Sequence, residues 1–335
     1  MPKNAELDLA LQFIEKTDRN LFITGKAGTG KTTFLHNVKA ASLKRMVVVA
    51  PTGVAAINAK GVTIHSFFQM PFGPILPNQI TQTSNQQRKF SKTKIDIIKS
   101  LDLVIIDEIS MVRADVLDGI DQVLRRYKNK HKVFGGVQIL MIGDLQQLAP
   151  VVKPNEWSLL QQHYNTVYFF SAKAFQEAQV VAIELQHIYR QKNENFIQIL
   201  NEIRNDQLSE GSATILNERY QPSFSPHKDE GYITLTTHNR RASIINDSEL
   251  NKLNTKNYFF EAEVSGKFNE NAFPNDEKLA LKVGAQVMFI KNDSSPEKRY
   301  YNGKIGVITD ISRENVTVQC ANEIDEIVTE KEQWD

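Results

Sequence analysis

The chain has 335 residues, of which 41% are hydrophobic and 24% charged, and its formal net charge is +1. This length suits two or three globular domains, and the near-neutral charge by itself predicts no polyanionic partner. The single cysteine, Cys320, excludes an internal disulfide and argues against a cysteine-based zinc site, as expected in a reducing compartment. An apolar run of about 18 residues is absent, as is the charged-then-apolar layout of a signal peptide, and both observations disfavour a membrane role.

The first predicted elements surround a phosphate-binding motif. Residues 5–16 carry a mainly helical apolar pattern, and the apolar run 21–24 predicts a strand that leads into GKAGTGKT. This segment matches GxxxxGK[ST] and opens onto the helix-compatible TTFLHNV, so both flanks that the motif requires are present. Such a loop lets consecutive N–H groups surround the β- and γ-phosphates, while the lysine reaches phosphate oxygens and the hydroxyl binds Mg²⁺. The expected nucleotide-binding residues are Gly25, Ala27, Gly28, Thr29, Gly30, Lys31, Thr32 and Thr33.

A βαβ unit follows the phosphate loop. Residues 46–50 predict a second strand, and APTGVAAINAKGVTIHSFF continues as a glycine loop, a helix and a strand, the order typical of a parallel sheet. The segment PFGPILP, 71–77, breaks any helix or strand, and 78–94 is polar. We therefore expect an exposed insertion over about 67–94.

Two carboxylates end the next predicted strand. The apolar run 103–106 leads directly into Asp107 and Glu108, and a parallel strand carries such acids to the carboxyl edge of its sheet. Asp107 is expected to hold Mg²⁺, directly or through water, and Glu108 to orient or deprotonate the attacking water. Many strands end in acids for solubility, so the pattern gains its strength from the intact phosphate loop in the same domain.

A helix, a strand and a polar turn come next. Apolar residues between 116 and 127 recur on one helical face, and 139–142 predicts a buried strand that ends in Gly143 and Asp144. Gln147 follows, with an amide suited to a γ-phosphate or its water, although taken alone it is more typical of a surface glutamine. Basic residues gather at 125–132 and at 291–304, a pattern more often found on solvated faces than at nucleic-acid sites.

The remaining chain predicts mixed and then β-rich structure. We expect a strand at 180–185, a helix around 196–203, and a loop over 209–230 with at most a short helix at 213–216. A strand at 232–236 and a helix with Ala242, Ile245 and Leu250 on its apolar side follow. From 279 onward short β runs alternate with turn residues, which indicates a small all-β module.

Together these motifs resemble the Pif-type (petite integration frequency) DNA helicases, in the RecD-like branch of superfamily 1. The likeness rests on GKAGTGKTT, PTGVAAINAKGVTIHSFF, DEISMVRADVLDGIDQVLRR, GGVQILMIGDLQQLAPV and YRQ, and it returns in TTHNRRASIIN and in LKVGAQVMFIKND with YYNGKIGVI. Their order and spacing make the likeness specific. It implies an α/β fold with a P-loop RecA-like parallel sheet in 1–180, a partial second RecA-like domain in 181–265, and a small Src-homology-3-like β-barrel in 266–335.

The resemblance also implies a function. An ATP-dependent helicase of this kind binds ATP and Mg²⁺ between two RecA-like domains, moves 5′ to 3′ along single-stranded DNA, and unwinds forks, with G-quadruplexes left open as substrates. It further implies a monomer in the bacterial cytoplasm or nucleoid, with roles in DNA repair, recombination and telomere maintenance. By motif match the catalytic residues are Lys31, Asp107, Glu108, Gln147 as a γ-phosphate sensor and Arg190 as an arginine finger, and the metal ligands are Thr32 and Asp107.

For DNA, the family pattern points to polar and backbone groups suited to sequence-blind phosphate contacts. These residues are Pro51, Thr52, Gly53, His65 and Ser66 in the first domain and Thr236, His238 and Asn239 in the second. Phe72 in the insertion stacks on a base, forms part of a strand-separating wedge, or anchors its own loop. His65 is likewise either a DNA contact or a satisfied core histidine.

Two departures from the family pattern stand out. The adenine-reading glutamine of the family falls by spacing on Asp8, and Gln12, one helical turn later, is the candidate substitute. The family's last two motifs do not occur before Asp335, so the chain resembles a helicase cut short, from which we expect slow hydrolysis and poor unwinding. A DNA-dependent P-loop ATPase that does not unwind, and a noncatalytic fragment that binds nucleotide and DNA, remain as alternatives. A small-molecule kinase is disfavoured because it needs neither GDLQQL nor YRQ.

Overall fold

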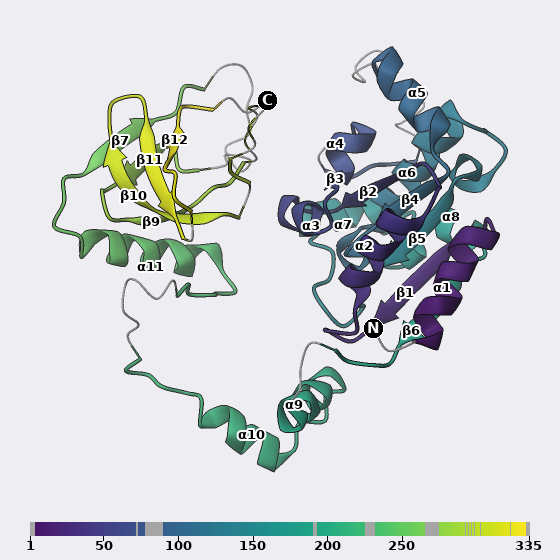
Figure 1. The fold of residues 1–335 in the computed structure, drawn as a ribbon, viewed down its shortest axis with the longest axis horizontal. Helices are drawn as coiled ribbons and strands as arrows, with labels where there is room; N and C mark the ends of the chain where they lie inside the picture. Colours follow the sequence, from purple (N-terminus) through teal and green to yellow (C-terminus); the bar gives the residue numbers. More distant parts are fainter. Residues whose placement is uncertain are drawn as a thin grey trace. The chain divides into compact units, whose positions relative to one another are not determined.

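The chain folds into two compact units, Met1–Tyr220 and Gln221–Asp335 (Figure 1). The computed structural model describes residues 4–71, 73–77, 90–189, 193–224, 232–264, 275–291, 293, 295, 297, 299–301, 303–321 and 323–332. Within these residues, no helix is both long and apolar enough to cross a bilayer.

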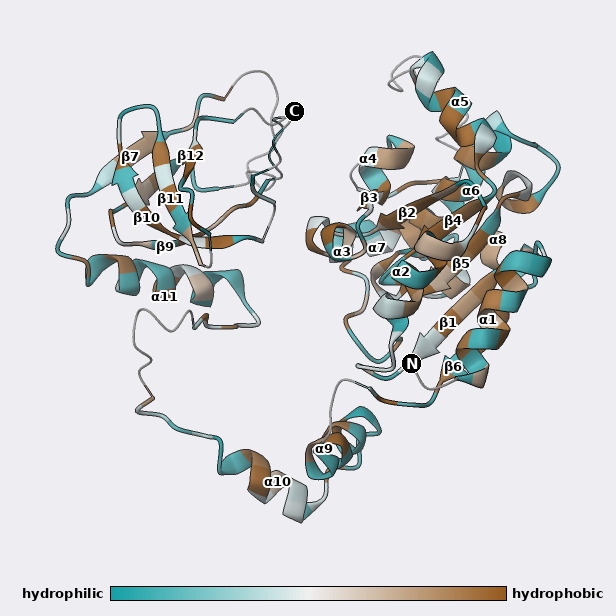
Figure 2. Ribbon diagram, viewed as in Figure 1, coloured by the Kyte–Doolittle hydropathy of each residue, from teal (hydrophilic) through white to brown (hydrophobic). Residues whose placement is uncertain are grey.

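A parallel sheet forms the centre of the first unit. Its six strands lie in the order β3-β2-β4-β5-β1-β6, and every pairing is parallel. The strands are β1 Leu21–Gly25, β2 Met46–Ala50, β3 Val62–Thr63, β4 Leu103–Ile106, β5 Gln138–Ile142 and β6 Val181–Leu185. The central strands β4 and β5 are buried along their whole length, which explains their continuous apolar sequence (Figure 2).

Helices pack against both faces of this sheet, because successive strand residues point to opposite sides. Ile105 of β4 shares one core with Ile14 of α1 and Leu35 of α2, whereas Ile106 shares the other with Ile98 of α5 and Leu117 of α6. The helices of this unit are α1 Ala5–Lys16, α2 Lys31–Ala41, α3 Gly53–Asn58, α4 Ile64–Phe68, α5 Lys92–Ser100, α6 Ala114–Tyr127, α7 Pro154–Leu160, α8 Lys173–Glu177, α9 Glu194–Arg204 and α10 Glu210–Asn217, with short 3₁₀ turns η1 Ile109–Met111, η2 Val133–Gly136 and η3 Phe169–Ser171.

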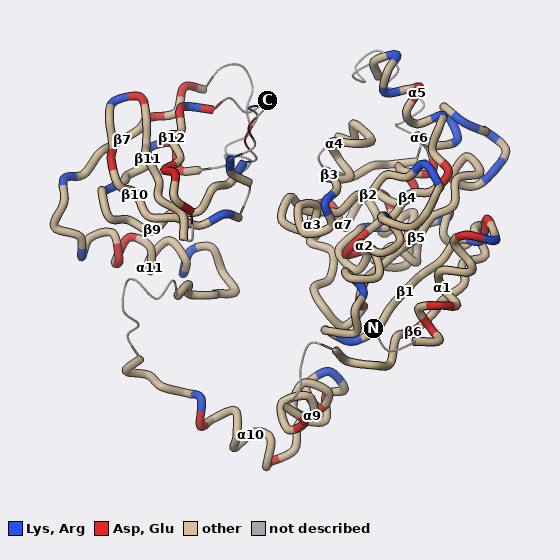
Figure 3. Tube along the Cα trace, in the orientation of Figure 1, with Lys and Arg blue, Asp and Glu red and all other residues tan. Residues whose placement is uncertain are grey.

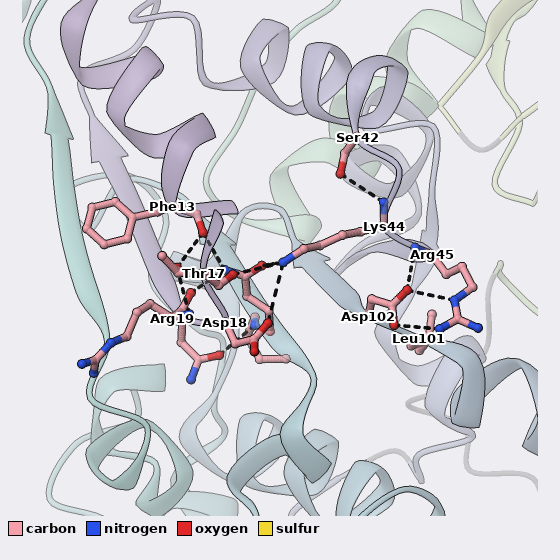
Figure 4. Close-up of polar contacts among 12 residues, drawn as sticks. Phe13, Thr17, Asp18, Arg19, Ser42, Lys44, Arg45, Leu101 and Asp102 are labelled. Atoms are coloured by element: carbon pink, nitrogen blue, oxygen red, sulfur yellow. Dashed lines mark hydrogen bonds and ion pairs between the residues drawn. The ribbon is translucent and has the colours of Figure 1, made fainter. Parts of the chain in front are cut away.

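Polar side chains tie the turns at the amino ends of the strands (Figure 4). Lys44, just before β2, donates from Nζ to the Thr17 carbonyl at 3.1 Å and to Oε1 of Gln138 at 2.8 Å. The Nε2 group of Gln138, which begins β5, donates to the Arg19 carbonyl at 2.7 Å. Next to Lys44, Arg45 makes a bidentate ion pair with Asp102, through Nε at 2.8 Å and Nη2 at 2.9 Å. These contacts join the connections that precede β1, β2, β4 and β5.

The second unit is rich in antiparallel strands. Its four-stranded sheet has the order β12-β11-β10-β9, and a separate pair is formed by β7 and β8. The core contains Ile308, Val318 and Ile327, and Leu250 of the preceding helix packs against it. The elements are α11 Asn239–Asn251, β7 Tyr258–Glu261, β8 Lys278–Leu281, β9 Gln286–Met288, β10 Ile305–Ile311, β11 Val316–Cys320 and β12 Ile327–Thr329.

The placement of one strand corrects the expected domain boundary. The sequence predicts that the strand at 180–185 belongs to the second domain. In the structure, β6 pairs with β1 from Leu21↔Val181 to Gly25↔Leu185. Ile183 and Leu185 are buried in the core of the first sheet, so the strand completes that sheet and the first unit continues to Tyr220. A division of the later residues at 265 stays a prediction.

One further expectation is wrong and another is wrong in part. Residues 232–236 form no strand, because no strand of the described residues pairs with them, and 232–235 are exposed. The insertion expected over about 67–94 is not wholly exposed, since Ile75 is only 4% exposed within the main core and Lys92–Ser100 form α5. The predicted short helix at 213–216 exists and is longer, as α10.

Candidate nucleotide and nucleic-acid site

Three loops that follow neighbouring strands meet at the carboxyl edge of the first sheet. Strands β4, β5 and β1 are adjacent and parallel, so their carboxyl ends lie side by side. The glycine-rich loop follows β1, Asp107 and Glu108 follow β4, and Asp144 follows β5. The topology therefore brings together the phosphate loop and the carboxylates expected from the sequence.

The phosphate loop has the backbone geometry that an anion site needs. Gly28 at φ +83° and Gly30 at φ +89° adopt the left-handed region that glycine tolerates best. Gly30 is also the N-cap of α2, and no side chain caps that end, so the first N–H groups of the helix face the loop. Among the expected loop residues, Thr29 is fully buried and its hydroxyl donates to the Lys26 carbonyl, while Ala27, Thr32 and Thr33 are exposed.

Lys31 lies inside the loop. Its Nζ donates to the Gly25 carbonyl at 2.7 Å and to the Lys26 carbonyl at 3.0 Å. Burial lowers the pKa of Lys31, and the nearby carboxylates of Asp144 and Glu108 oppose that shift. An ammonium held by two neutral carbonyls in a partly buried loop gains from the approach of a phosphate, which supplies charged acceptors instead.

Asp107 and Glu108 form a paired acidic site at the end of β4. Asp107 is 7% exposed, and its burial, with the adjacent Glu108 carboxylate as the second cause, raises the pKa of Asp107 to about 6. Glu108 sits at φ +50°, a left-handed conformation unusual for a residue with a side chain. Two neighbouring carboxylates together with the exposed Thr32 hydroxyl fit Mg²⁺, which takes one or two protein oxygens besides phosphate and water.

Asp144 collects donors from two parts of the unit. The Gln147 side chain donates from Nε2 to Oδ2 of Asp144 at 3.2 Å, and Arg204 at the end of α9 donates from Nη1 to the same oxygen at 2.5 Å. Burial opposes the charge of Asp144, but the hydrogen bonds from Arg204 and the Gln146 N–H outweigh it and hold the pKa of this carboxyl below its usual value. The expected sensor, Gln147, is thus oriented by a carboxylate that is already paired.

The segment after β6 crosses the phosphate loop. The Tyr189 N–H donates to the Gly28 carbonyl at 2.7 Å, and the Tyr189 ring lies close to Gly30. Asn4 caps α1 through Oδ1 and donates from Nδ2 to the Tyr189 hydroxyl at 3.1 Å. Gln12 is exposed on the same helix, and the polar contacts between this helix and the segment come from Asn4 and from Glu6, whose Oε2 accepts the Gln186 N–H at 3.4 Å.

The first-unit DNA candidates lie at the neighbouring ends of β2 and β3. Thr52 caps α3 by accepting the Ala55 N–H at 3.2 Å and keeps its own O–H for another acceptor, and Pro51 and Gly53 flank it. Ser66 is exposed, whereas His65 is half-buried, and burial followed by the nearby Arg113 lowers the pKa of His65. His65 is therefore neutral near pH 7, suited to a hydrogen bond rather than an ion pair.

A buried ion pair holds the proline-rich segment beside these candidates. Arg113 donates to both oxygens of the fully buried Asp115 at 2.9 and 2.7 Å, and to the Gly73 carbonyl at 2.6 Å. The same Asp115 accepts the Ile75 N–H at 2.8 Å. This anchoring explains why Ile75 is buried although its segment has no regular structure. Phe72 itself lies outside the described residues, as does Arg190.

The second-unit candidates form a local turn. The Thr236 hydroxyl donates to the His238 carbonyl at 2.9 Å and accepts the His238 N–H at 3.1 Å, and Asn239 begins α11. His238 and Asn239 are exposed, which suits a contact with solvent-borne phosphates. Their roles stay predictions.

Comparison with known proteins decides the family. A model described as PIF1-like helicase matches residues 7–214. The chain belongs to the PIF1-like helicase family. It is 30% identical over 312 residues to the ATP-dependent DNA helicase PIF1 of Saccharomyces cerevisiae, covering 88% of this chain and 34% of the relative. With the ATP-dependent DNA helicase Pif1 of Campylobacter jejuni it shares 31% over 310 residues, covering 87% of this chain and 66% of the relative.

Solved structures of PIF1-like helicases have the same fold. The crystal structure of Bacteroides Pif1 with ADP-AlF3 and single-stranded DNA has a TM-score of 0.87 and 41% identity, over 98% of this chain and 75% of that chain. Bacteroides Pif1 bound to single-stranded DNA has a TM-score of 0.86 and 40% identity, over 98% and 74%. The RecA-like parallel sheet predicted from the sequence is thus confirmed, and the C-terminal antiparallel strands are consistent with the predicted small β module. The chain spans 34% to 66% of the length of the two curated relatives.

Several side chains of the two basic runs of this PIF1-like helicase chain make hydrogen bonds or ion pairs within their own unit. Figure 3 shows where Lys and Arg lie along the chain. Arg125 pairs with Asp121 and Glu177, each at 2.7 Å, and Lys128 donates to the Leu101 carbonyl. In the later run, Lys304 pairs with Glu323 at 2.7 Å. These contacts favour the structural interpretation of the charge runs.

Sequence reasoning missed several residues of the site. Arg204 carried no local signal, because it ends an amphipathic helix where a basic residue is common. In the sequence, Asp144 is marked only by its place after Gly143 at the end of a predicted strand. Asn4 and Tyr189 meet across 185 residues of sequence, so only the fold brings them together. Arg113 and Asp115 lie inside the DEISMVRAD segment that carried the family resemblance, which is the one signal that pointed to them.

Proposed function

We propose that this chain is the ATP-hydrolysing part of a DNA helicase that moves 5′ to 3′ along single-stranded DNA and unwinds duplex ahead of it. The observation that carries the proposal is the shared carboxyl edge of β1, β4 and β5, where Lys31, Asp107, Glu108 and the Asp144–Gln147 pair meet. The neighbouring ends of β2 and β3 hold the DNA candidates, so nucleotide and DNA would bind along one edge.

In this proposal, the phosphate loop binds and orients the nucleotide. The open N-terminus of α2 and the Lys31 ammonium receive the phosphates, and Glu108 takes a proton from the attacking water while Gln147 orients that water or the terminal phosphate. Thr32 and Asp107 would hold Mg²⁺, which neutralises phosphate charge when bound. Arg190 is proposed, by family resemblance alone, as a further cation toward the transferred phosphate.

DNA recognition in this proposal is blind to sequence. Thr52, Ser66 and the turn at Thr236 offer hydroxyl and backbone groups, which suit phosphates rather than base edges. We expect affinity for single-stranded DNA to fall as salt rises and to vary little with base sequence. A fluorescence-anisotropy titration over salt and over several oligonucleotides measures both properties. Affinity that does not change with salt would contradict this mode of binding.

The proposal is tested by pairing two assays on one preparation. Single-stranded DNA should stimulate ATP hydrolysis, and strand displacement should occur on a duplex with a 5′ tail but not on one with a 3′ tail. Hydrolysis without displacement would identify a DNA-dependent ATPase that does not unwind, and nucleotide binding without hydrolysis would identify a binding fragment. Displacement only from a 3′ tail would overturn the direction.

We also propose that one chain is sufficient for DNA-stimulated hydrolysis. One related structure concerns two coordinating Pif1 helicases at forked double-stranded DNA. Light scattering of the chain with and without a short oligonucleotide, beside hydrolysis rates at several protein concentrations, tests the proposal. A turnover per chain that rises with protein concentration would contradict it.

A further inference from the structure

Asp144 contacts two segments of the first unit, its own turn at Gln146 and Gln147 and, 60 residues later in the sequence, Arg204 at the end of α9. Its carboxylate is 1% exposed and accepts the Gln146 N–H at 3.1 Å on Oδ1. Its Oδ2 accepts both the Gln147 side chain, at 3.2 Å, and the Arg204 guanidinium, at 2.5 Å. Because two donors share one oxygen atom, a change in either contact alters the geometry available to the other.

The Gln147 amide is well placed to act while it is held in this way. A glutamine amide has two N–H donors and one acceptor oxygen, and the bond to Asp144 occupies one donor. The second N–H and Oε1 remain for a terminal phosphate or a water molecule. Arg204 neutralises the carboxylate that fixes this orientation, because a buried and unpaired Asp144 would otherwise be strongly unfavourable.

Arg204 also connects the phosphate site to the helices that lead out of the first unit. Within its own helix, Glu202 accepts the Ser209 N–H at 3.0 Å and the Ser209 hydroxyl at 2.8 Å. Ser209 in turn caps α10 by accepting the Ser212 N–H at 3.3 Å. We call α9 and α10 together, Glu194–Asn217, the connector, because the chain passes through them before it enters the second unit at Gln221.

We propose that Arg204 is a positioning residue that holds Gln147 through Asp144 and makes the connector respond to the terminal phosphate. The inference rests on the proposed function, since it takes Gln147 as the phosphate sensor. When the Gln147 amide binds the terminal phosphate, its hydrogen bond to Oδ2 of Asp144 changes. The Arg204 guanidinium then moves relative to Asp144, and the end of α9 moves with it. Coupling between sites requires an element with two arrangements, and the Gln147–Asp144–Arg204 contacts are the element that we propose here.

The first test is a double-mutant cycle in DNA-stimulated ATP turnover. Arg204→Gln and Gln147→Ala should each lower turnover about tenfold, with a smaller loss of nucleotide affinity, and the double variant should be no slower than the slower single variant. Arg219→Gln is the matched control, because Arg219 is an exposed arginine just beyond α10. Losses that multiply in the double variant would overturn the proposal, as would parent-like turnover of Arg204→Gln or an equal loss in the control.

The second test does not depend on turnover. Hydrogen exchange of the α9 amides is measured with and without ADP-aluminium fluoride, and the parent should show a change that both Gln147→Ala and Arg204→Gln lack. An equal change in all three proteins, or none in the parent, would overturn the inference. A parent that hydrolyses no ATP but shows the expected exchange pattern would contradict the proposed function while supporting the coupling.

A stability control guards against misfolding. Arg204→Gln leaves Asp144 buried without its cation. The double variant Asp144→Asn with Arg204→Gln removes both charges and is therefore measured beside it. This pair of substitutions should melt close to the parent and still lack the nucleotide-dependent change in α9. If the pair melts like the parent and keeps that change, Arg204 is merely structural and the proposal fails.

Discussion

The two edges of the first sheet are built from the same residue types and organised in opposite ways. At the amino edge, Lys44 bonds to Gln138 and the Thr17 carbonyl, and Arg45 is matched with Asp102. At the carboxyl edge, the hydrogen bonds of the Lys31 ammonium to described residues go to the carbonyls of its own loop, at Gly25 and Lys26, although three carboxylates are near enough to influence its pKa.

Left-handed backbone occurs at both edges, since Phe134 at φ +51° and Gln179 at φ +46° precede β5 and β6 at the amino edge. The two edges differ instead in the setting of their charged groups. The carboxyl edge contains Glu108 beside the phosphate loop. It also contains Asp107, whose burial raises its pKa to about 6. Polar groups that are satisfied within the chain stabilise the fold, whereas groups held in unfavourable surroundings are available to a ligand that relieves them. We therefore expect the amino edge to contribute mainly to stability and the carboxyl edge mainly to the chemistry.

The largest expected effect comes from Glu108→Gln. Removing the proposed base should lower DNA-stimulated ATP hydrolysis by about 10²–10⁴-fold, because general acid–base catalysis contributes that much. Nucleotide affinity should stay close to the parent value, since the proposed role of Glu108 is on the attacking water rather than on the phosphate. Single-turnover hydrolysis and a fluorescent-nucleotide titration measure the two quantities. Glu177→Gln, which changes a partner of Arg125, is the control, and Glu108→Gln hydrolysis at the parent rate would rule out this role.

Lys31→Ala should give the next largest effect, and on a different quantity. Loss of charge-assisted bonds to phosphate should weaken nucleotide binding about 10- to 100-fold. The free energy of unfolding without nucleotide should not fall, because burial already lowers the pKa of Lys31 and its ammonium is held by two neutral loop carbonyls. Calorimetric titration and urea unfolding provide the data. Lys26→Ala in the same loop is the control, and a large loss of stability in Lys31→Ala would erase the contrast between the edges.

Much of the carboxyl edge was predictable because its motifs are local. The strands 21–24, 46–50 and 103–106 correspond to β1, β2 and β4 within a residue, since buried parallel strands have continuous apolar runs. The loop residues and Asp107 follow from those strands. Local patterns do not show which distant segments pair. The sequence of β6 fits a strand of either domain, and only its pairing with β1 assigns it to the first sheet.

The contacts at the amino edge could hardly be predicted from the sequence. Lys44, Gln138 and Asp102 are ordinary polar residues in turns and at a strand start, and nothing in their spacing predicts that they meet. Arg204 and Asp144 pose the same difficulty on the carboxyl edge, because 60 residues separate them. The segment 232–236 fails for the converse reason, since its β-type composition is evident but a strand also needs a partner.

Lys44→Ala should produce a moderate effect confined to stability. It leaves the Oε1 atom of Gln138, a residue only 1% exposed, and the Thr17 carbonyl without a donor, at a cost of about 1–3 kcal/mol. Turnover per folded molecule should match the parent. Lys16→Ala, at an exposed position of α1, should have little effect on either quantity. Unchanged stability in Lys44→Ala would show that the network does not support the amino edge.

The smallest expected effect concerns His65 and pH. Burial, and then Arg113, lower the pKa of His65, while Asp115 opposes the shift. Below its ordinary pKa of about 6.5 the unfolded chain therefore binds the proton more readily than the folded chain, and stability falls as pH decreases. The free energy of unfolding, measured from pH 7.5 to 5.5, should decline more steeply for the parent than for His65→Gln. Equal slopes for the parent and His65→Gln would mean that the pKa of His65 is the same in the folded and unfolded chains.

The most direct test of the division between the edges measures ATP turnover per folded molecule and the free energy of unfolding on the same samples. Glu108→Gln and Lys44→Ala each represent one edge and are compared with the parent. We predict opposite outcomes: Glu108→Gln loses turnover and keeps stability, and Lys44→Ala loses stability and keeps turnover. If each variant lost both turnover and stability, the proposed division between the two edges would be contradicted.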